Sequence, residues 1–349
     1  MSDEQDNEAR VPSAPRRRAN GRAPTIYDIA ELTGVNPSTV SRALGKPGRV
    51  SASTEARIRA AANELKFRIN PMARALPTGR THTLSLVVAD ITNPMIFGLV
   101  RGAEMAATAA GYTLVIAESQ ESGEAEAGVI EQLMPSVDGI VLATTRLGPQ
   151  RIADIASRKP LVLINRVVEG VPGIVSDTES GATALVMHLF DLGHRSIAYL
   201  SGPPTSWMNE RRSEVILDLA EELGIAIVEI GPGPPTLDGG RSMLRRVLAS
   251  RVTAVIAFND LMAMGLMQAA AAAEVAVPGH LSVAGFDDVF GSELITPALT
   301  TVRAPLIEAG ELAVRQLLAG FSSDEPTREV AEHLLPTELI VRGSTAAPN

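Results

Sequence analysis

TIYDIAELTGVNPSTVSRAL, residues 25–44, is the stretch that decides the architecture of the N-terminal part of this chain. Ala30, Gly34 and Val40 have the spacing of two short helices packed across a tight turn. Ala30 is small, so the second helix can approach the first closely. Gly34 can end the first helix because glycine adopts left-handed backbone angles without steric cost. Pro37 suits the first position of the second helix, because a backbone N–H at that position would have no partner within the helix and proline has none. The whole pattern predicts a helix-turn-helix.

The outer face of the second helix is polar. Asn36 can cap its start, and the face carries short hydroxyl donors and one long guanidinium, groups that suit phosphates and base edges. These residues are Ser38, Thr39, Ser41 and Arg42. A helix-turn-helix with a polar second helix usually reads a DNA groove. An ordinary helical hairpin with a solvated face is the alternative.

Charge is divided unevenly along the chain. The net charge of the 349 residues is −9. Residues 1–80 hold 14 Lys and Arg against 8 Asp and Glu, a net of +6, whereas the rest holds 17 against 32, a net of −15. A basic head on an acidic body indicates that only the head meets a polyanion such as DNA, because the acidic body would repel it.

The N-terminal segment, the apolar runs and the lack of cysteine indicate the cellular compartment of the protein. We expect residues 1–23, polar and rich in Arg, Pro and Ala, to form a disordered basic tail. No apolar stretch of signal-peptide length follows the arginines at 16–18, so we expect no export. The longest apolar run, around 261–273, is too short to span a membrane. The chain has no cysteine, which excludes disulfides and thiolate metal sites and fits a reducing cytoplasm.

A third helix and a short segment follow the first two helices. Ser51 is a plausible cap, and apolar residues such as Ile58 recur after it at helical spacing. Residues 24–69 are therefore expected to form one small three-helix domain. Residues 70–76 can form about two helical turns before Pro77, which is too short a helix to be stable alone in water. We interpret residues 70–80 as a hinge helix and linker that needs a partner to become ordered.

Short β-branched runs then alternate with amphipathic helices, for example 96–110 and 178–192. The expected strands are 84–89, 113–117, 139–143, 161–164, 197–200, 226–230, 254–258 and 281–286. Nearly continuous apolar strands that alternate with helices predict parallel sheets covered on both faces, an α/β architecture. About 260 residues is long for one sheet, so two sheets with a cleft between them fit better. In such folds ligands bind outside the carboxyl ends of the strands.

Polar side chains follow five of these strands. They include Asp90, Asn93, Asn165, Ser206, Trp207, Asn259, Asp260, Asp287 and Asp288. An aspartate at a strand-to-helix junction is often only an N-cap, and loops at strand ends are polar in most α/β proteins. Together these loops indicate a polar pocket.

Motifs of catalysis and metal binding are missing. The glycines of 231–240 do not have the dinucleotide-binding spacing, and 45–50 lacks the spacing of a phosphate loop. The chain has neither a G-x-S-x-G elbow nor an H-E-x-x-H helix. His188 and His194 have no acidic partner at metal-ligand spacing. We therefore expect no enzyme, no metal and no cofactor.

A series of motifs, in order along the chain, resembles the lactose-repressor (LacI/GalR) family of bacterial transcription regulators. They are TIYDIAELTGVNPSTVSRAL, RVSASTEARIRAAANELKFRINPMARAL, DITNP, LGHRSIAYLSGP, AFNDLMAMG, SVAGFDD and PALTTVR. The resemblance runs from Thr25 to Gly343. It implies a homodimer or tetramer, a hinge helix that becomes ordered on operator DNA, and a two-subdomain core like that of periplasmic sugar-binding proteins. A small effector bound between the subdomains would then change the affinity for the operator.

The resemblance assigns DNA contacts residue by residue. Pro37, Ser38 and Arg42 match the base-reading positions of the recognition helix, although Pro37 offers only apolar contact. Leu76 matches the hinge leucine that wedges into the minor groove, and Ala73 matches the small residue where two hinge helices pack. The full set of expected DNA contacts is Thr25, Tyr27, Pro37, Ser38, Thr39, Ser41, Arg42, Asn70, Ala73 and Leu76.

The resemblance also assigns effector contacts. Arg212 and Asp260 match two effector-binding positions, and a guanidinium facing a carboxylate suits vicinal hydroxyls or a purine edge. A structural salt bridge between the two is the alternative. Met95 and Ile96 stand where many members have aromatic residues, and Trp207 can supply the missing stacking face. The expected effector-binding residues are Asn93, Met95, Ile96, Asn165, Trp207, Arg212, Asp260 and Asp287.

These expectations define the domains and the function. The core is expected over 81–343, with one subdomain of 81–176 and 287–303, a second of 177–286 and 305–340, and a tail of 344–349. The leading interpretation is a cytoplasmic repressor that binds double-stranded operator DNA and a sugar-like effector, without membrane contact. A sugar-phosphate or purine effector, a solute-binding protein without a regulatory role, and a sugar or nucleotide enzyme are the alternatives.

Overall fold

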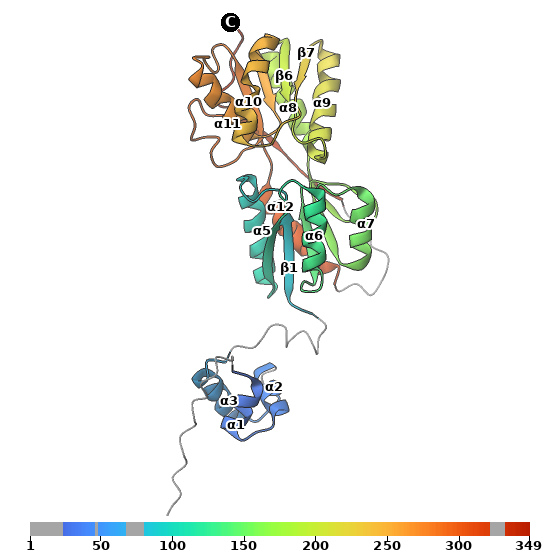
Figure 1. Cartoon of the computed structure of the whole chain (residues 1–349), viewed down its shortest axis with the longest axis vertical. Helices are drawn as coiled ribbons and strands as arrows, with labels where there is room; N and C mark the ends of the chain where they lie inside the picture. Colours follow the sequence, from blue (N-terminus) through green and yellow to red (C-terminus); the bar gives the residue numbers. More distant parts are fainter. Residues whose placement is uncertain (1–23, 46–47, 68–79, 322–331) are drawn as a thin grey trace, which may run out of the picture. The chain divides into compact units, whose positions relative to one another are not determined.

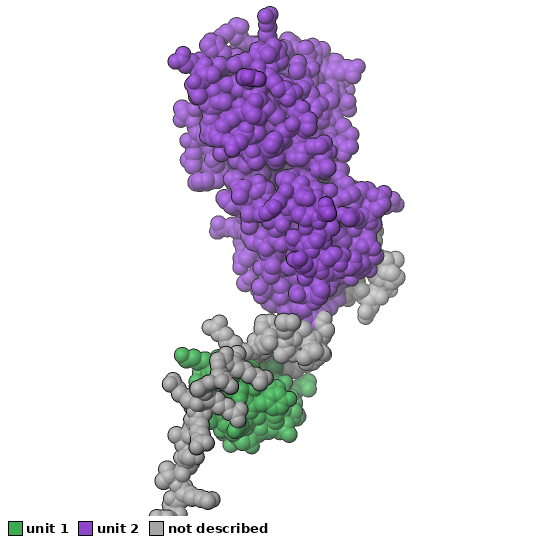
Figure 2. Space-filling model, viewed as in Figure 1, with its two compact units in different colours: residues 1–74 green, residues 75–349 purple. Residues whose placement is uncertain are grey.

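A computed structural model describes residues 24–45, 48–67, 80–321 and 332–349 of the chain (Figure 1). The chain forms two compact units, unit 1 with residues 1–74 and unit 2 with residues 75–349 (Figure 2). The expected basic tail, and Asn70, Ala73 and Leu76 of the expected hinge, lie outside the described residues.

Unit 1 contains the predicted helix-turn-helix. Helix α1 (Ile26–Thr33) ends at Gly34, whose φ of 64° is left-handed, and α2 (Pro37–Gly45) begins at Pro37. The side chain of Asn36 accepts a hydrogen bond of 3.1 Å from the backbone N–H of Ser38. Ala30 and Val40 are buried between the helices. The two helices therefore begin, end and pack where the spacing of these residues predicts.

A third helix completes the described part of unit 1. Helix α3 (Ala52–Glu64) begins at Ser51, whose hydroxyl accepts a hydrogen bond from the backbone N–H of Thr54. Ile58 of α3 is fully buried against Ile29 and Val40 of the first two helices. Burial of these three side chains, each contributing roughly 1.5–3 kcal/mol, gives the small unit its core.

Unit 2 contains two six-stranded sheets. The first has the order β11-β5-β4-β3-β1-β2 and is parallel throughout. Its strands are β1 (Thr83–Val88), β2 (Thr113–Glu118), β3 (Gly139–Ala143), β4 (Leu161–Ile164), β5 (Gly173–Ser176) and β11 (Glu332–Leu335). The second has the order β12-β10-β9-β8-β6-β7, with only β12 antiparallel. Its strands are β6 (Ser196–Leu200), β7 (Ala226–Ile230), β8 (Ala254–Ala257), β9 (Ser282–Asp287), β10 (Thr300–Arg303) and β12 (Glu338–Ile340).

Helices cover both sheets (Figure 1). They are α5 (Met95–Ala109), α6 (Gly123–Leu133), α7 (Pro149–Arg158), α8 (Thr178–Asp191), α9 (Trp207–Leu223), α10 (Leu237–Ser250), α11 (Asp260–Ala272) and α12 (Leu306–Ala319). The pairs α5–α12 and α10–α11 pack closely through glycines. A Cβ on Gly102 of α5 would overlap the carbonyl oxygen of Ile307, and a Cβ on Gly265 of α11 would overlap that of Leu237. No helix among the described residues has the length and apolarity needed to cross a membrane.

All eight strands expected from the sequence are present, with ends shifted by at most one residue. The expected division of the core after residue 286 is wrong. Strand β10 at 300–303 pairs with β9 in the second sheet, whereas α12 and β11 pack with the first sheet. The chain crosses between the sheets after β5, β10 and β11. These late segments are short, and the sheet that each joins depends on which distant strand edge it can pair with.

The expected tail of 344–349 is part of the second sheet's packing. Ser344 is fully buried, and its hydroxyl accepts a hydrogen bond of 2.8 Å from the backbone N–H of Thr300. The ring of His194, which is also buried, lies 2.9 Å from the carbonyl oxygen of Ala346 and 2.8 Å from the hydroxyl of Thr253. Buried polar groups need such partners, so this terminal segment is fixed.

Candidate functional site

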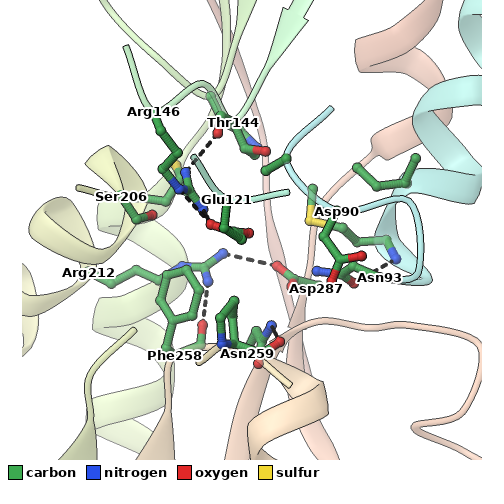
Figure 3. A pocket seen from close by; sticks show the side chains of 16 residues that line it. Asp90, Asn93, Glu121, Thr144, Arg146, Ser206, Arg212, Phe258, Asn259 and Asp287 are labelled. Carbon is green, nitrogen blue, oxygen red and sulfur yellow. Dashed lines mark hydrogen bonds and ion pairs between the residues drawn. The ribbon is translucent and has the colours of Figure 1, made fainter. Parts of the chain in front are cut away.

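A cavity of about 40 Å³ lies between the two sheets of unit 2, at the carboxyl ends of their strands (Figure 3). The first sheet contributes the loops after β1, β2, β3 and β4. The second contributes the start of α9 and the ends of β8 and β9. The charged lining residues are Asp90, Glu121, Arg146, Arg212 and Asp287. The position agrees with the rule that open α/β sheets bind ligands beyond their strand ends.

The guanidinium of Arg212 is held from several sides at the cavity wall. Its Nη2 lies 3.0 Å from Oδ1 of Asp287, and both side chains are less than a tenth exposed. Its Nη1 donates to the carbonyl oxygen of Phe258. The guanidinium carbon lies 4.3 Å from the ring centre of Phe286 and 5.2 Å from that of Phe258. Two rings, a carboxylate and a carbonyl therefore hold one cation at the cavity.

Burial raises the pKa of Asp287 above its ordinary value, and the charge and hydrogen bond of Arg212 act against that rise. The ion pair is what permits a carboxylate at this depth, because an unpaired buried charge is strongly unfavourable.

A second ion pair lines the cavity from the first sheet. Nη2 of Arg146 lies 2.6 Å from Oε2 of Glu121, and Nη1 donates to the carbonyl oxygen of Thr144 over 2.7 Å. The backbone N–H of Arg146 donates to the buried Glu126, whose pKa burial raises. The loops after β2 and β3 are therefore fastened to each other at the cavity (Figure 3).

Amide side chains from both sheets complete the lining. The side-chain oxygen of Asn165 accepts from the backbone N–H of Ser176 over 3.1 Å. Asn259 caps α11 by accepting from Met262 over 2.9 Å, and its amide nitrogen donates to the carbonyl oxygen of Pro235 over 3.0 Å. Such bonds fix the orientation of each amide before a ligand arrives.

Six of the eight expected effector-binding residues line this cavity: Asn93, Met95, Ile96, Asn165, Arg212 and Asp287. Asp260 and Trp207 do not. Asp260 is fully buried and binds the backbone N–H of Val289 and the hydroxyls of Ser292 and Thr301. The expected pair of Arg212 with Asp260 is corrected, since Asp287 is the partner of Arg212.

Helix phase explains both differences. Successive helical residues turn by about 100°, so neighbours at a helix start point in different directions. Asn259 lines the cavity, and the next residue, Asp260, turns into the protein. Ser206 and Met208 likewise line the cavity. Trp207, which stands between them in the sequence, is half-buried and packs against the core.

The sequence patterns singled out none of seven lining residues: Ala89, Glu121, Thr144, Arg146, Met208, Pro235 and Phe258. Five of them, Ala89, Glu121, Thr144, Arg146 and Phe258, stand at or within four residues of the end of an expected strand. A survey of all strand ends, including those without aspartate or asparagine, would have found them.

The polar face of α2 is the second candidate site. Ser38, Ser41 and Arg42 are exposed, and Pro37 and Thr39 are half-buried. Nε of Arg42 donates to the carbonyl oxygen of Ser38 over 3.2 Å. In α1, Tyr27 is 69% exposed and Thr25 donates its backbone N–H to Asp28 over 2.7 Å. The outer face of α2 thus presents hydroxyls and a guanidinium to solvent.

Comparison with known proteins covers almost the whole chain. Residues 25–70 match the family model of bacterial regulatory proteins of the lacI family, and residues 186–345 match a periplasmic binding protein-like domain. The transcriptional regulator DegA of Bacillus subtilis is 32% identical over 335 residues, which is 93% of this chain and 99% of DegA. GalR of Escherichia coli K12 is 32% identical over 333 residues, 93% of this chain and 96% of GalR.

A solved structure is similar in fold. The crystal structure of the lac repressor dimer bound to operator and the anti-inducer ONPF matches with a TM-score of 0.82 and 26% identity, over 93% of this chain and all of that chain. The architecture and the helix-turn-helix indicate the same family as the relatives do, and those relatives are aligned along almost their full length. The chain belongs to the lacI family of bacterial regulatory proteins.

Proposed function

We propose that the protein is a repressor that binds operator DNA through unit 1 as a homodimer, and that an uncharged polyol of sugar size, bound in the cavity of unit 2, controls its affinity for the operator. The observation that carries the effector site is the ion pair of Arg212 and Asp287, held between two rings at the cavity wall. A guanidinium and a carboxylate side by side offer donors and acceptors to vicinal hydroxyls.

The charges of the lining favour an uncharged effector. Asp90, Glu121 and Asp287 stand against Arg146 and Arg212. Both guanidiniums are already ion-paired with carboxylates of the chain. A phosphate group would enter a site with an excess of negative charge and would have to displace one of these carboxylates. A neutral polyol meets neither obstacle.

The size of the cavity connects binding with a change of shape. About 40 Å³ accommodates roughly one to three water molecules, which is less than a sugar needs. The effector must therefore shift the two sheets or their loops to enter. A ligand moves such an equilibrium only by binding one arrangement better than the other, and an altered dimer geometry would change how two heads reach two half-sites.

A second copy of the chain has surface to pack against. Large apolar side chains of unit 2 are exposed on α5 and on β2, namely Phe97, Met105 and Ile116. Exposed apolar surface of this kind is typical of interfaces. The lac repressor relative was solved as a dimer on its operator. The proposal places the protein in the cytoplasm with its DNA and assigns it no catalytic step.

A purine-like effector is the second candidate, because the ring of Phe258 lines the cavity and could stack on a base. A solute-binding protein without a regulatory role is disfavoured by the polar, exposed face of α2 in unit 1.

The experiment combines DNA selection with a ligand screen on the full chain. Selection from a random duplex library should yield a palindromic site that is protected in footprinting. Melting should be followed with D-ribose, D-galactose, cellobiose, glucose 6-phosphate and hypoxanthine. A neutral sugar at about 100 times its Kd should stabilise the protein by about 2.7 kcal/mol, with no response to the phosphate. Only salt-labile, non-specific DNA binding would overturn the repressor proposal, and a response to hypoxanthine alone would select the second candidate.

A further inference from the structure

The loops after β2 and β3 hold a guanidinium whose binding edge is already occupied by a carboxylate of the chain. Nε of Arg146 donates to Oε2 of Glu121 over 2.7 Å, and its Nη2 lies 2.6 Å from the same oxygen (Figure 3). These two nitrogens form one edge of the planar guanidinium, and such an edge binds a carboxylate or a phosphate. Glu121 therefore takes the place that an anionic ligand of Arg146 would take.

Arg146 is also held by contacts that do not involve Glu121. Its Nη1 donates to the carbonyl oxygen of Thr144 over 2.7 Å, and its backbone N–H donates to the side chain of Glu126 over 2.8 Å. A Cβ on Gly123 would lie 2.9 Å from the carbonyl oxygen of Arg146, so this loop packs closely against the start of α6. Without the side chain of Glu121, the guanidinium would stay anchored and its Nε and Nη2 would be free to donate.

Glu121 is the more exposed partner of the ion pair. Its side chain is 26% exposed, whereas the side chain of Arg146 is 5% exposed. Both residues line the effector cavity. An anion that approaches the guanidinium from solvent therefore meets the carboxylate, and the two negative charges repel each other more strongly in a partly buried site than in water.

The backbone at Glu121 is in a conformation that glycine adopts more readily. Its φ is 59°, and the φ of the preceding residue, Gln120, is 52°. Residues other than glycine rarely adopt such left-handed angles, and strained backbone of this kind is concentrated at functional sites. A glycine at either position fits the backbone without steric cost, which allows the carboxylate to be removed without a new strain.

We propose that Glu121 is a specificity-determining residue, whose carboxylate occupies the binding edge of Arg146 and so excludes phosphorylated ligands from the cavity. The inference rests on the effector cavity of the proposed function and assigns its preference for neutral ligands to one side chain. The lining has three carboxylates, of Asp90, Glu121 and Asp287, against two guanidiniums. Without Glu121 the two signs are balanced and one guanidinium edge is free, so the cavity should accept a phosphate group at Arg146.

Titration calorimetry of the full chain with inorganic phosphate, at constant ionic strength, tests the proposal in Glu121→Gly. Glycine removes the carboxylate, makes room at the guanidinium and suits the backbone angle. We expect the affinity for phosphate to rise at least about tenfold above that of the wild type, the effect of one additional charge-assisted hydrogen bond. Circular dichroism shows whether each variant is folded.

The matched control is Gln120→Gly, the same replacement at the adjacent residue, which is exposed and has nearly the same φ. It should bind phosphate as the wild type does, and it corrects for any general effect of phosphate on the protein. Adding Arg146→Gln to Glu121→Gly should abolish the gain, because the free guanidinium edge is then missing. A gain that persists in the double variant would overturn the role assigned to Arg146.

The phosphate affinities decide the proposal independently of the neutral effector. An affinity of Glu121→Gly no higher than that of the wild type would overturn the role of Glu121, and so would a wild type that binds phosphate as tightly as the variant. Failure of the proposed function is a different result, namely no melting response of the wild type to any neutral sugar. If Glu121→Gly does not fold, Glu121→Gln decides, because it removes the charge at almost the same size. A gain of several-fold in that variant supports the proposal, and no gain contradicts it.

Discussion

Replacing Arg212 by leucine would leave the carboxylate of Asp287 buried without its cation. The pair lies 3.0 Å apart with both side chains less than a tenth exposed, so water solvates the remaining charge only poorly. Removing one partner of such a pair costs about 3–5 kcal/mol of folding free energy. For a unit of this size the melting temperature should fall by roughly 10 °C.

The pH dependence identifies the cause. Arg212 lowers the pKa of Asp287 against the effect of burial, so Arg212→Leu should raise that pKa further. An acid whose folded pKa exceeds its unfolded value destabilises the fold increasingly as pH rises from the unfolded pKa to the folded one. The stability difference between Arg212→Leu and wild type should therefore be smaller at pH 5 than at pH 8. Adding Asp287→Asn removes the stranded charge and should recover most of the loss.

Urea unfolding of the full chain, followed by circular dichroism at several pH values, measures these differences. Arg211→Leu is the matched control, because the neighbouring arginine forms an ion pair with Glu214 in which both side chains are about half exposed. Such a pair contributes about 0–1 kcal/mol. A loss for Arg212→Leu no greater than for Arg211→Leu, or one that is the same at pH 5 and pH 8, would refute the reasoning.

Three further predictions concern other parts of the chain. Arg42→Ala should cost about 1–3 kcal/mol of operator affinity if the side chain reads a guanine edge, and calorimetry with operator DNA should show this while effector binding is unchanged. Gly102→Ala should lower the free energy of unfolding by about 1–3 kcal/mol, because its Cβ would overlap the carbonyl of Ile307, whereas Gly128→Ala on α6 meets no atom within 4 Å and should not destabilise. Burial lowers the pKa of His194, so its stabilising contribution is complete above its unfolded pKa of about 6.5 and is lost as pH falls below it. His194→Gln should flatten the stability profile between pH 7.5 and 5, and an equally steep profile would contradict the assignment.

Much of the fold was predictable because its signals are local. Gly34, Pro37 and Ser51 fix the ends of the head's helices through backbone angles and caps that involve only near neighbours. The eight expected strands were recognisable as continuous apolar runs, since strands buried on both faces need apolar residues at every position. A helix cap or an apolar strand of this kind depends only on a few consecutive residues.

For the candidate site, the sequence predicted which strand ends meet at the cavity. Parallel strands bring their carboxyl ends to one edge, which is why Asn93, Asn165 and Asp287 line one cavity. Which of two adjacent residues faces that cavity depends on the phase of the following helix. The choice between Asn259 and Asp260 therefore could not be made from their chemistry alone.

The sequence by itself determined the helix-turn-helix, the alternating strands and helices of the core, and the loops that meet at the cavity. Only the tertiary structure decided that β10 joins the second sheet while α12 and β11 join the first, and that Arg212 pairs with Asp287. The physical reason is range. Arg212 and Asp287 are 75 residues apart, and such partners meet only when whole sheets and helices have docked. Their pairing is set by the burial and close packing of many distant residues together, which no local pattern records.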